Sequence, residues 1–202
     1  MGRARDLANI LSSSGNVALD SEMGLSLITP TSIANTGGSA SISSTGAVSF
    51  TSASAISLNS VFTSTYDNYK ILFELTGAST STTLLGRLRV GGTDATAGSY
   101  TTNVIVNTTT TVAGSETGNA TYWDFRSYNT AVRYVLVLDV LRPNTTGEHL
   151  ISGNVFTLNA SSAWQVNHLG GKFTGATAYD SISFIANSGN ITGTVRVYGY
   201  RN

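Results

Sequence analysis

Alternation of apolar and polar side chains is the strongest pattern in the chain, and it begins near residue 69. Four large apolar side chains in residues 69–75 alternate with Lys70, Leu72 and Glu74. Because successive side chains of a strand point to opposite faces, this spacing predicts a strand with one face on a core. The same pattern, punctuated by glycine and asparagine, predicts eight further strands. They cover residues 83–90, 103–107, 120–125, 131–141, 150–158, 163–169, 181–186 and 193–200.

The segments between these strands have the composition of turns and loops. Residues 91–94, 170–171 and 187–190 are rich in Gly, Asn and Asp, which favours turns, and residues 108–119 form a polar loop in this interpretation. No amphipathic helical period occurs among them, so we expect an all-β domain, an antiparallel β-sandwich or a jelly-roll-like fold. The core candidates are Ile71, Phe73, Leu88, Val132, Tyr134, Leu136, Leu138, Val155, Trp164, Phe184, Val195 and Val197.

Residues 3–11 are the one segment with helical spacing. Leu7, Ile10 and Leu11 fall on one face of such a helix, and Ser12 begins a stretch that ends it. A helix of about two turns is marginal in water by itself. We therefore expect this short N-terminal helix to dock on a partner surface, the alternative being a frayed tail.

Residues 12–57 are dominated by Ser, Thr, Ala, Gly and Asn, with isolated apolar positions. Such a stretch buries too little apolar area to order itself. Residues 47–50 and 55–58 nevertheless alternate like short strands, so the segment is expected to be extended and to pair with other chains or with the domain that follows; the alternative is a flexible linker. The predicted organisation is an N-terminal anchor and extended stem at 1–57 and a sandwich at 58–202.

Composition narrows the classes of partner. Only 11% of the 202 residues are charged and the formal net charge is zero, so the sequence predicts neither nucleic-acid binding nor attraction to an anionic membrane. Without cysteine the chain has no disulfides and no thiolate metal ligands. No run of apolar residues reaches the length of a membrane span. No cofactor-binding motif is present, and none is expected.

The residues that carry most enzyme chemistry are few and scattered. His149 and His168 lie in different segments, the first in a predicted turn and the second near a predicted strand end, so structural or surface roles are expected for both. A zinc site needs three or four ligands, and no motif supplies them. Glycoside hydrolysis needs a pair of carboxylates, and Asp20 with Glu22 is the one local pair, which favours a solvated turn. The sequence therefore predicts a protein that is not an enzyme.

Aromatic side chains gather in residues 122–128. Tyr122, Trp123 and Tyr128 are candidate glycan contacts because aromatic rings stack on sugars. Strand alternation sends about half of this group into the core. The glycan hypothesis is therefore secondary at this stage.

Three segments resemble tail-fibre-like virion structural proteins of tailed, marine-type bacteriophages. They are Ser-Leu-Asn-Ser-Val-Phe-Thr-Ser-Thr-Tyr-Asp-Asn-Tyr at 57–69, Gly-Thr-Val-Arg-Val-Tyr-Gly-Tyr at 193–200 and Ala-Arg-Asp-Leu-Ala-Asn at 4–9. The first resembles a recurring segment of such proteins, the second the close of the same domain, and the third the start of fibre proteins. None of the three is a catalytic signature.

The resemblance implies a short tail fibre or appendage subunit of a virion, made in the host cytoplasm, whose sandwich faces a host-surface glycan or protein. The alternatives are a capsid decoration or head-fibre protein and a stand-alone glycan-binding module. A homotrimer is expected because fibre-like relatives are usually trimeric and because the stem has apolar positions that one chain does not cover. The residues expected to anchor the subunit to other virion proteins are Arg3, Arg5, Asp6, Leu7, Ile10 and Leu11.

Overall fold

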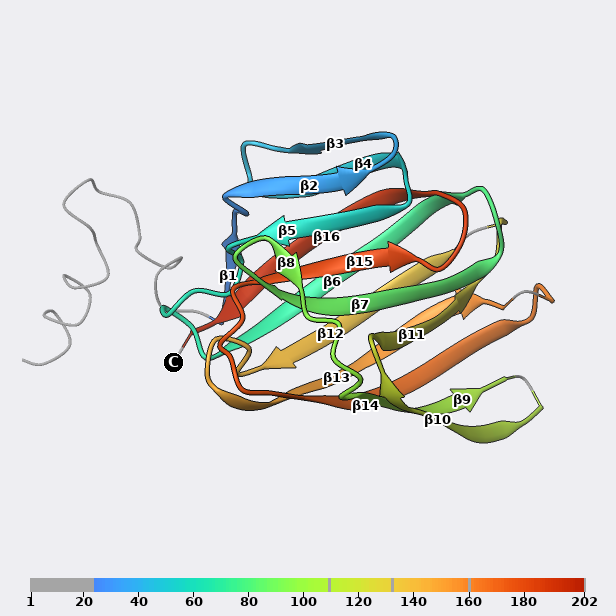
Figure 1. Ribbon diagram of the computed structural model, residues 1–202. Helices are drawn as coiled ribbons and strands as arrows, with labels where there is room; N and C mark the ends of the chain where they lie inside the picture. Colours follow the sequence, from blue (N-terminus) through green and yellow to red (C-terminus); the bar gives the residue numbers. More distant parts are fainter. Residues whose placement is uncertain (1–23, 109, 132, 160, 202) are drawn as a thin grey trace, which may run out of the picture.

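Two antiparallel sheets face each other (Figure 1) in the computed structural model, which describes residues 24–108, 110–131, 133–159 and 161–201. The larger sheet has the order β10 (Val112–Ala120), β9 (Tyr100–Asn107), β14 (Trp164–Gly175), β13 (Gly147–Leu158), β12 (Tyr134–Leu141), β6 (Asn68–Ala78), β16 (Ile191–Tyr200), β4 (Val48–Ala53) and β3 (Ser39–Ile42), with β1 (Leu25–Ile28) also paired to β16. The smaller sheet has the order β11 (Trp123–Tyr128), β7 (Thr82–Val90), β15 (Ser181–Ala186), β5 (Ala55–Asn59) and β2 (Ser32–Thr36), with β8 (Thr93–Asp94) paired to β7.

The core lies between the sheets and is built from the alternating residues that the sequence indicates. Phe73 of β6 and Phe184 of β15 meet across the sandwich with ring centroids 4.7 Å apart, and Leu136 is fully buried beside them. The other core candidates that are buried as expected are Ile71, Leu88, Tyr134, Leu138, Val155, Val195 and Val197. The all-β sandwich prediction is confirmed for the described residues. None of those residues belongs to a helix with the length and apolarity that a membrane crossing needs.

Two predictions for the N-terminal part of the chain have different outcomes. The helix expected at residues 3–11 lies outside the described residues, as does the core candidate Val132. The extended pairing expected within 12–57 is visible from residue 25 onward, because β1, β3 and β4 join the larger sheet and β2 and β5 join the smaller one. Val48, Phe50 and Ile56 are buried in the core, so this part of the segment is covered by its own chain.

Three sequence expectations are wrong. Residues 108–119, expected to be a polar loop, contain most of β10, which pairs with β9 as an edge strand. Gly170 and Gly171, expected to be a turn, lie in the middle of the twelve-residue strand β14. Trp164, expected in the core, is 46% exposed on the outer face of the larger sheet.

The two histidines also lie elsewhere than expected. The sequence predicts a turn at His149, but His149 is a fully buried residue of β13. The sequence predicts a strand end near His168, but His168 lies within β14 and is exposed.

The segment at 57–69 connects the two sheets. It leaves β5 of the smaller sheet, buries Val61 and Phe62, and enters β6 of the larger sheet. The Tyr69 hydroxyl donates to Thr63 O at 2.6 Å and accepts from Thr63 N at 2.7 Å. The buried part of this segment therefore belongs to the fold, while Ser64, Thr65 and Asp67 face solvent.

Candidate functional site

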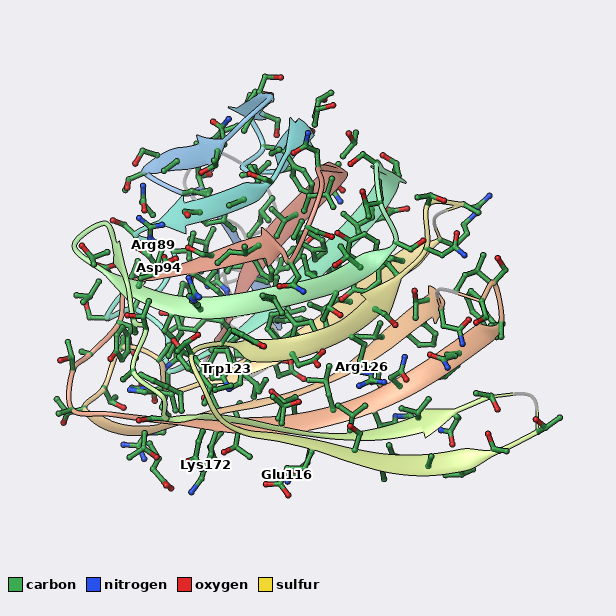
Figure 2. The ribbon with its side chains drawn as sticks, turned by 45° about the vertical axis from the view of Figure 1, so that its right-hand side comes forward. Arg89, Asp94, Glu116, Trp123, Arg126 and Lys172 are labelled. Carbon is green, nitrogen blue, oxygen red and sulfur yellow. The ribbon has the colours of Figure 1, made fainter. Side chains whose placement is uncertain are left out.

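A groove of about 820 Å³ lies on the outer face of the larger sheet, where β10, β9, β14 and β13 run side by side. Figure 2 shows Glu116 and Lys172 projecting from this outer side, while Trp123 and Arg126 lie on the other side, between the sheets. Each of the four strands contributes three consecutive residues to the lining, and those of β14 are His168, Leu169 and Gly170.

Strand register arranges the groove residues in two rows. The first row crosses the four strands as Glu116, Asn103, Gly170 and Ser152, and the second as Gly114, Ile105, His168 and Asn154. Neighbouring strands are about 4.8 Å apart, so each row is about 14 Å long, and the rows are about 7 Å apart along the strands. The groove residues therefore form two parallel rows of side chains that are accessible from solvent.

Gly170 forms the floor of the groove. Its flanking residues across the sheet are Asn103 and Ser152, and its outward neighbours along β14 are His168 and Lys172. A Cβ atom added at Gly170 would have no atom nearer than Ile151 O at 3.9 Å. A side chain would therefore fit there, and its absence leaves a hollow with polar side chains on all four sides.

Gly171 has the opposite environment, although it is the next residue of the same strand. It points inward, and a Cβ atom there would lie 2.5 Å from Thr101 O and 3.0 Å from the Ile151 side chain. The inner glycine lets β14 approach its neighbours closely, and the outer one opens the groove. Strand β14 therefore continues through the glycine pair, with β9 and β13 paired on its two sides.

His168 and Asn154 form a hydrogen-bonded pair in the second row. His168 Nδ1 lies 2.5 Å from Asn154 Oδ1, and because an amide oxygen can only accept, the imidazole donates from Nδ1. The second ring nitrogen of His168, Nε2, and the Asn154 amide nitrogen stay available for a ligand, the amide nitrogen as a donor. The groove therefore offers donors and acceptors side by side, with the apolar Ile105 in the same row.

Charge in and around the groove is sparse. Lys172 lies 3.4 Å from Glu148 of β13 in an ion pair whose side chains are about half exposed, and Glu116 supplies a carboxylate at the β10 edge. Among the residues that the structure describes, no group of three His, Asp or Glu side chains could hold a metal ion. Hydrogen bonding and apolar contact are the chemistry that this groove offers.

The aromatic residues proposed from sequence as glycan contacts are not in the groove. Trp123 and Tyr128 are core residues; the Trp123 indole donates to Lys172 O at 3.1 Å, and burial raises the pKa of Tyr128 to about 12. Tyr122 is half-buried and immediately precedes β11. The residues expected from sequence to anchor the subunit, Arg3, Arg5, Asp6, Leu7, Ile10 and Leu11, lie outside the described residues.

Sequence reasoning missed the groove residues for an identifiable reason. Asn103, Asn154 and His168 are single polar residues in unremarkable strands, and only the register brings them together. The available signal was the Gly170 and Gly171 pair inside an alternating stretch, a position where glycine often marks close backbone approach or a ligand.

A second polar cluster lies on the smaller sheet, and its groups are paired with one another. Arg89 lies 3.1 Å from the carboxylate of Asp94, which accepts from Ser183 Oγ at 2.7 Å (both charged residues are labelled in Figure 2). Arg89 also donates to Ser57 Oγ and Gly92 O. These contacts hold the β7–β8 hairpin against the rest of the smaller sheet, so the cluster has a structural role.

Comparison with known proteins gives no family. No family model matches the chain, and no curated protein matches it. Among solved structures, the chain is similar to a galectin from Caenorhabditis elegans, with 10% identity over 70% of this chain and 88% of the galectin and a TM-score of 0.30.

Two other solved structures are similar at the same low level. One is domain 4 of an extracellular GH43 arabinanase from Geobacillus stearothermophilus, in complex with arabinotriose, with 14% identity over 98% of this chain and 90% of that domain and a TM-score of 0.31. The other is the CBM2 module of the evolved Dit of Lactobacillus casei BL23 phage J-1, with 8% identity over 91% and 94% and a TM-score of 0.21. All three TM-scores are below 0.5, so a ligand has to be inferred from the groove of this chain itself.

Proposed function

We propose that this protein is a binding module that recognises a neutral oligosaccharide through the groove on β10, β9, β14 and β13, and that it acts by binding rather than by catalysis. The observation that carries the proposal is the hollow at Gly170, which has Asn103, Ser152, His168 and Lys172 around it. A small number of placed polar groups in an open depression is typical of sites that orient a small ligand.

Sugar chemistry fits this groove better than other small ligands do. A pyranose ring needs both donors and acceptors for its hydroxyl groups, and Asn154, His168 and Asn103 supply both. Its apolar C–H face needs an apolar contact, and Ile105 in the groove is 51% exposed. The charged groups at the margins of the groove are Lys172, Glu148 and Glu116, and Lys172 pairs with Glu148. The groove therefore favours a neutral ligand over an anionic one.

A glycan array probed with the full chain, followed by calorimetry on the best ligands, tests the proposal. Gly170→Val fills the floor with a residue that favours strands, so this variant should stay folded and lose binding. Asn154→Ala and His168→Ala should each weaken binding by about 1 to 3 kcal/mol. Thr194→Val, on β16 of the same sheet and outside the groove, is the matched control and should bind like wild type. Absence of binding to every neutral glycan, or equal binding by Gly170→Val, would contradict the proposal.

A second proposal concerns the setting in which the module works. The segments at 57–69 and 193–200, which resemble phage fibre proteins, are here the connection between the sheets and nearly all of β16. A resemblance located in fold-defining segments supports a shared domain in a virion appendage, a short tail fibre first and a capsid decoration or head fibre second. The host-surface ligand would then be the glycan, and the homotrimer and the N-terminal anchor belong to the same proposal.

Immunogold labelling of particles tests this setting. Label at the tail supports the fibre, and label over the head supports the decoration or head-fibre alternative. Particles without the protein, combined with glycan binding by the free chain, favour the stand-alone module.

A further inference from the structure

Trp164 continues the outer face of the groove strand. Trp164, Val166, His168 and Gly170 are the successive outward residues of β14, and Trp164 is 46% exposed. On the neighbouring strand β13, Phe156 lies opposite Val166 and is 37% exposed. An apolar aromatic surface therefore adjoins the polar groove on the same sheet face.

The two ends of the groove along β14 are different. At the Lys172 end, a ligand that follows β14 would meet the ion pair between Lys172 and Glu148. Towards Trp164, the surface becomes apolar and the indole offers a flat ring with few rotatable bonds, so that its contact costs little conformational entropy. Trp164 lies four positions before His168, which is about 14 Å along the strand. A single sugar ring does not cover that distance.

We propose that the bound oligosaccharide runs along β14 from the hollow at Gly170 and stacks a further ring on Trp164, with Phe156 at its side. This inference rests on the proposed function. It names the ligand class more narrowly as a neutral chain longer than a disaccharide, whose outer ring presents an apolar C–H face. Trp164 is then the residue that selects for chain length, while Asn154 and His168 hold the ring in the groove.

Tryptophan fluorescence can report on ligand binding at this subsite. It has two tryptophans, of which Trp123 is fully buried and only Trp164 is accessible. A ring stacked on Trp164 should shift the emission to shorter wavelength and protect the accessible tryptophan from acrylamide. We expect these changes with the tetrasaccharide of the best-binding array series and not with its disaccharide.

Affinity should show the same dependence on length. In wild type the tetrasaccharide should bind about three- to tenfold more tightly than the disaccharide, the size of one aromatic contact. Trp164→Ala removes an exposed side chain, so it should fold, lose that advantage and keep the disaccharide affinity. Leu150→Ala is the matched control, because Leu150 is 44% exposed on the same face next to Lys172 and should leave both affinities unchanged.

The outcomes separate this inference from the proposed function. Equal affinities for the two ligands, or a tetrasaccharide that leaves Trp164 fluorescence unchanged, overturn the subsite while the groove stands. Loss of the length effect in Leu150→Ala instead of Trp164→Ala overturns the direction along β14. Absence of any glycan binding in calorimetry overturns both proposals together.

Discussion

At the scale of single residues, His149 shows how the core holds a titratable side chain. It is fully buried on β13, its Nδ1 lies 3.2 Å from Arg142 O, and its ring stacks at 6.1 Å on Phe173. Burial lowers the pKa of His149 from its ordinary value of 6.5, and backbone hydrogen bonds to Arg142 and Thr177 oppose that shift without cancelling it. The core therefore favours the neutral imidazole.

The lowered pKa predicts a loss of stability in mild acid. Below pH 6.5 the unfolded chain binds a proton at His149 that the folded chain binds only at lower pH, so the free energy of unfolding falls as the pH falls through this window. Urea unfolding between about pH 7.5 and about pH 5.5 measures the decline. His149→Gln should flatten it, and His168→Gln, a change at the exposed histidine, should leave it in place. A decline of equal size in His149→Gln would show that other groups cause it.

At the scale of elements, β14 shows that the role of a glycine in a strand depends on the face of the sheet on which the glycine lies. Gly170 and Gly171 have the same side chain and adjacent positions, yet one faces solvent and the other meets the backbone of Thr101. The sequence suggested a turn because glycine weakens strands. Pairing on both sides, with β9 and β13, carries the strand through the pair.

The glycine pair gives a matched prediction. Gly171→Ala would place its Cβ atom 2.5 Å from Thr101 O, and since backbone oxygen moves only with its strand, the free energy of unfolding should fall by about 1 to 3 kcal/mol. Gly170→Ala meets no atom nearer than 3.9 Å and should raise it by about 0.5 to 1 kcal/mol. Denaturant unfolding of the two variants decides this. Similar effects of both substitutions would mean that β14 does not have the described inner and outer faces.

At the scale of the whole molecule, both sheets are completed by segments far apart in the sequence. The strand β16, near the C-terminal end, pairs with β1 and β4 on one hand and with β6 on the other. Because the apolar positions from Val48 onward are covered within the chain, they no longer serve as a reason for a trimer. The trimer stays a prediction from the resemblance to fibre proteins.

Removal of residues 1–11 separates folding from attachment. All described strands begin at Leu25 or later and pair with one another, so the free energy of unfolding should change by less than about 0.5 kcal/mol. If the anchor hypothesis is right, the truncated protein should be missing from assembled particles, while full-length Gly170→Val, altered only in the groove, should be incorporated. Incorporation of the truncated protein at normal copy number would place attachment elsewhere in the chain.

The sequence by itself determined the fold class and most of the strands, because a period of two is a local property that each segment carries independently of its partners. Tyr134 to Leu141 and Asn68 to Ala78 could be recognised in this way, and so could the inward residues Phe73, Leu136 and Val197. The polar edge strand β10 could not, since its alternation is among small and polar side chains and its pairing depends on β9.

The tertiary structure decided which face each side chain of β14 takes, and with it the groove. Large apolar residues occupy both faces of β14, Trp164 and Val166 on one and Leu169 and Phe173 on the other. Leu169 and Phe173 are buried in the core, so Trp164 points out. The candidate site then arises from cross-strand register, which brings Asn103, Gly170 and Ser152 into one row. Register depends on contacts between residues far apart in the sequence, such as Asn103 and Gly170, which are 67 positions apart, and no local pattern in the chain encodes it.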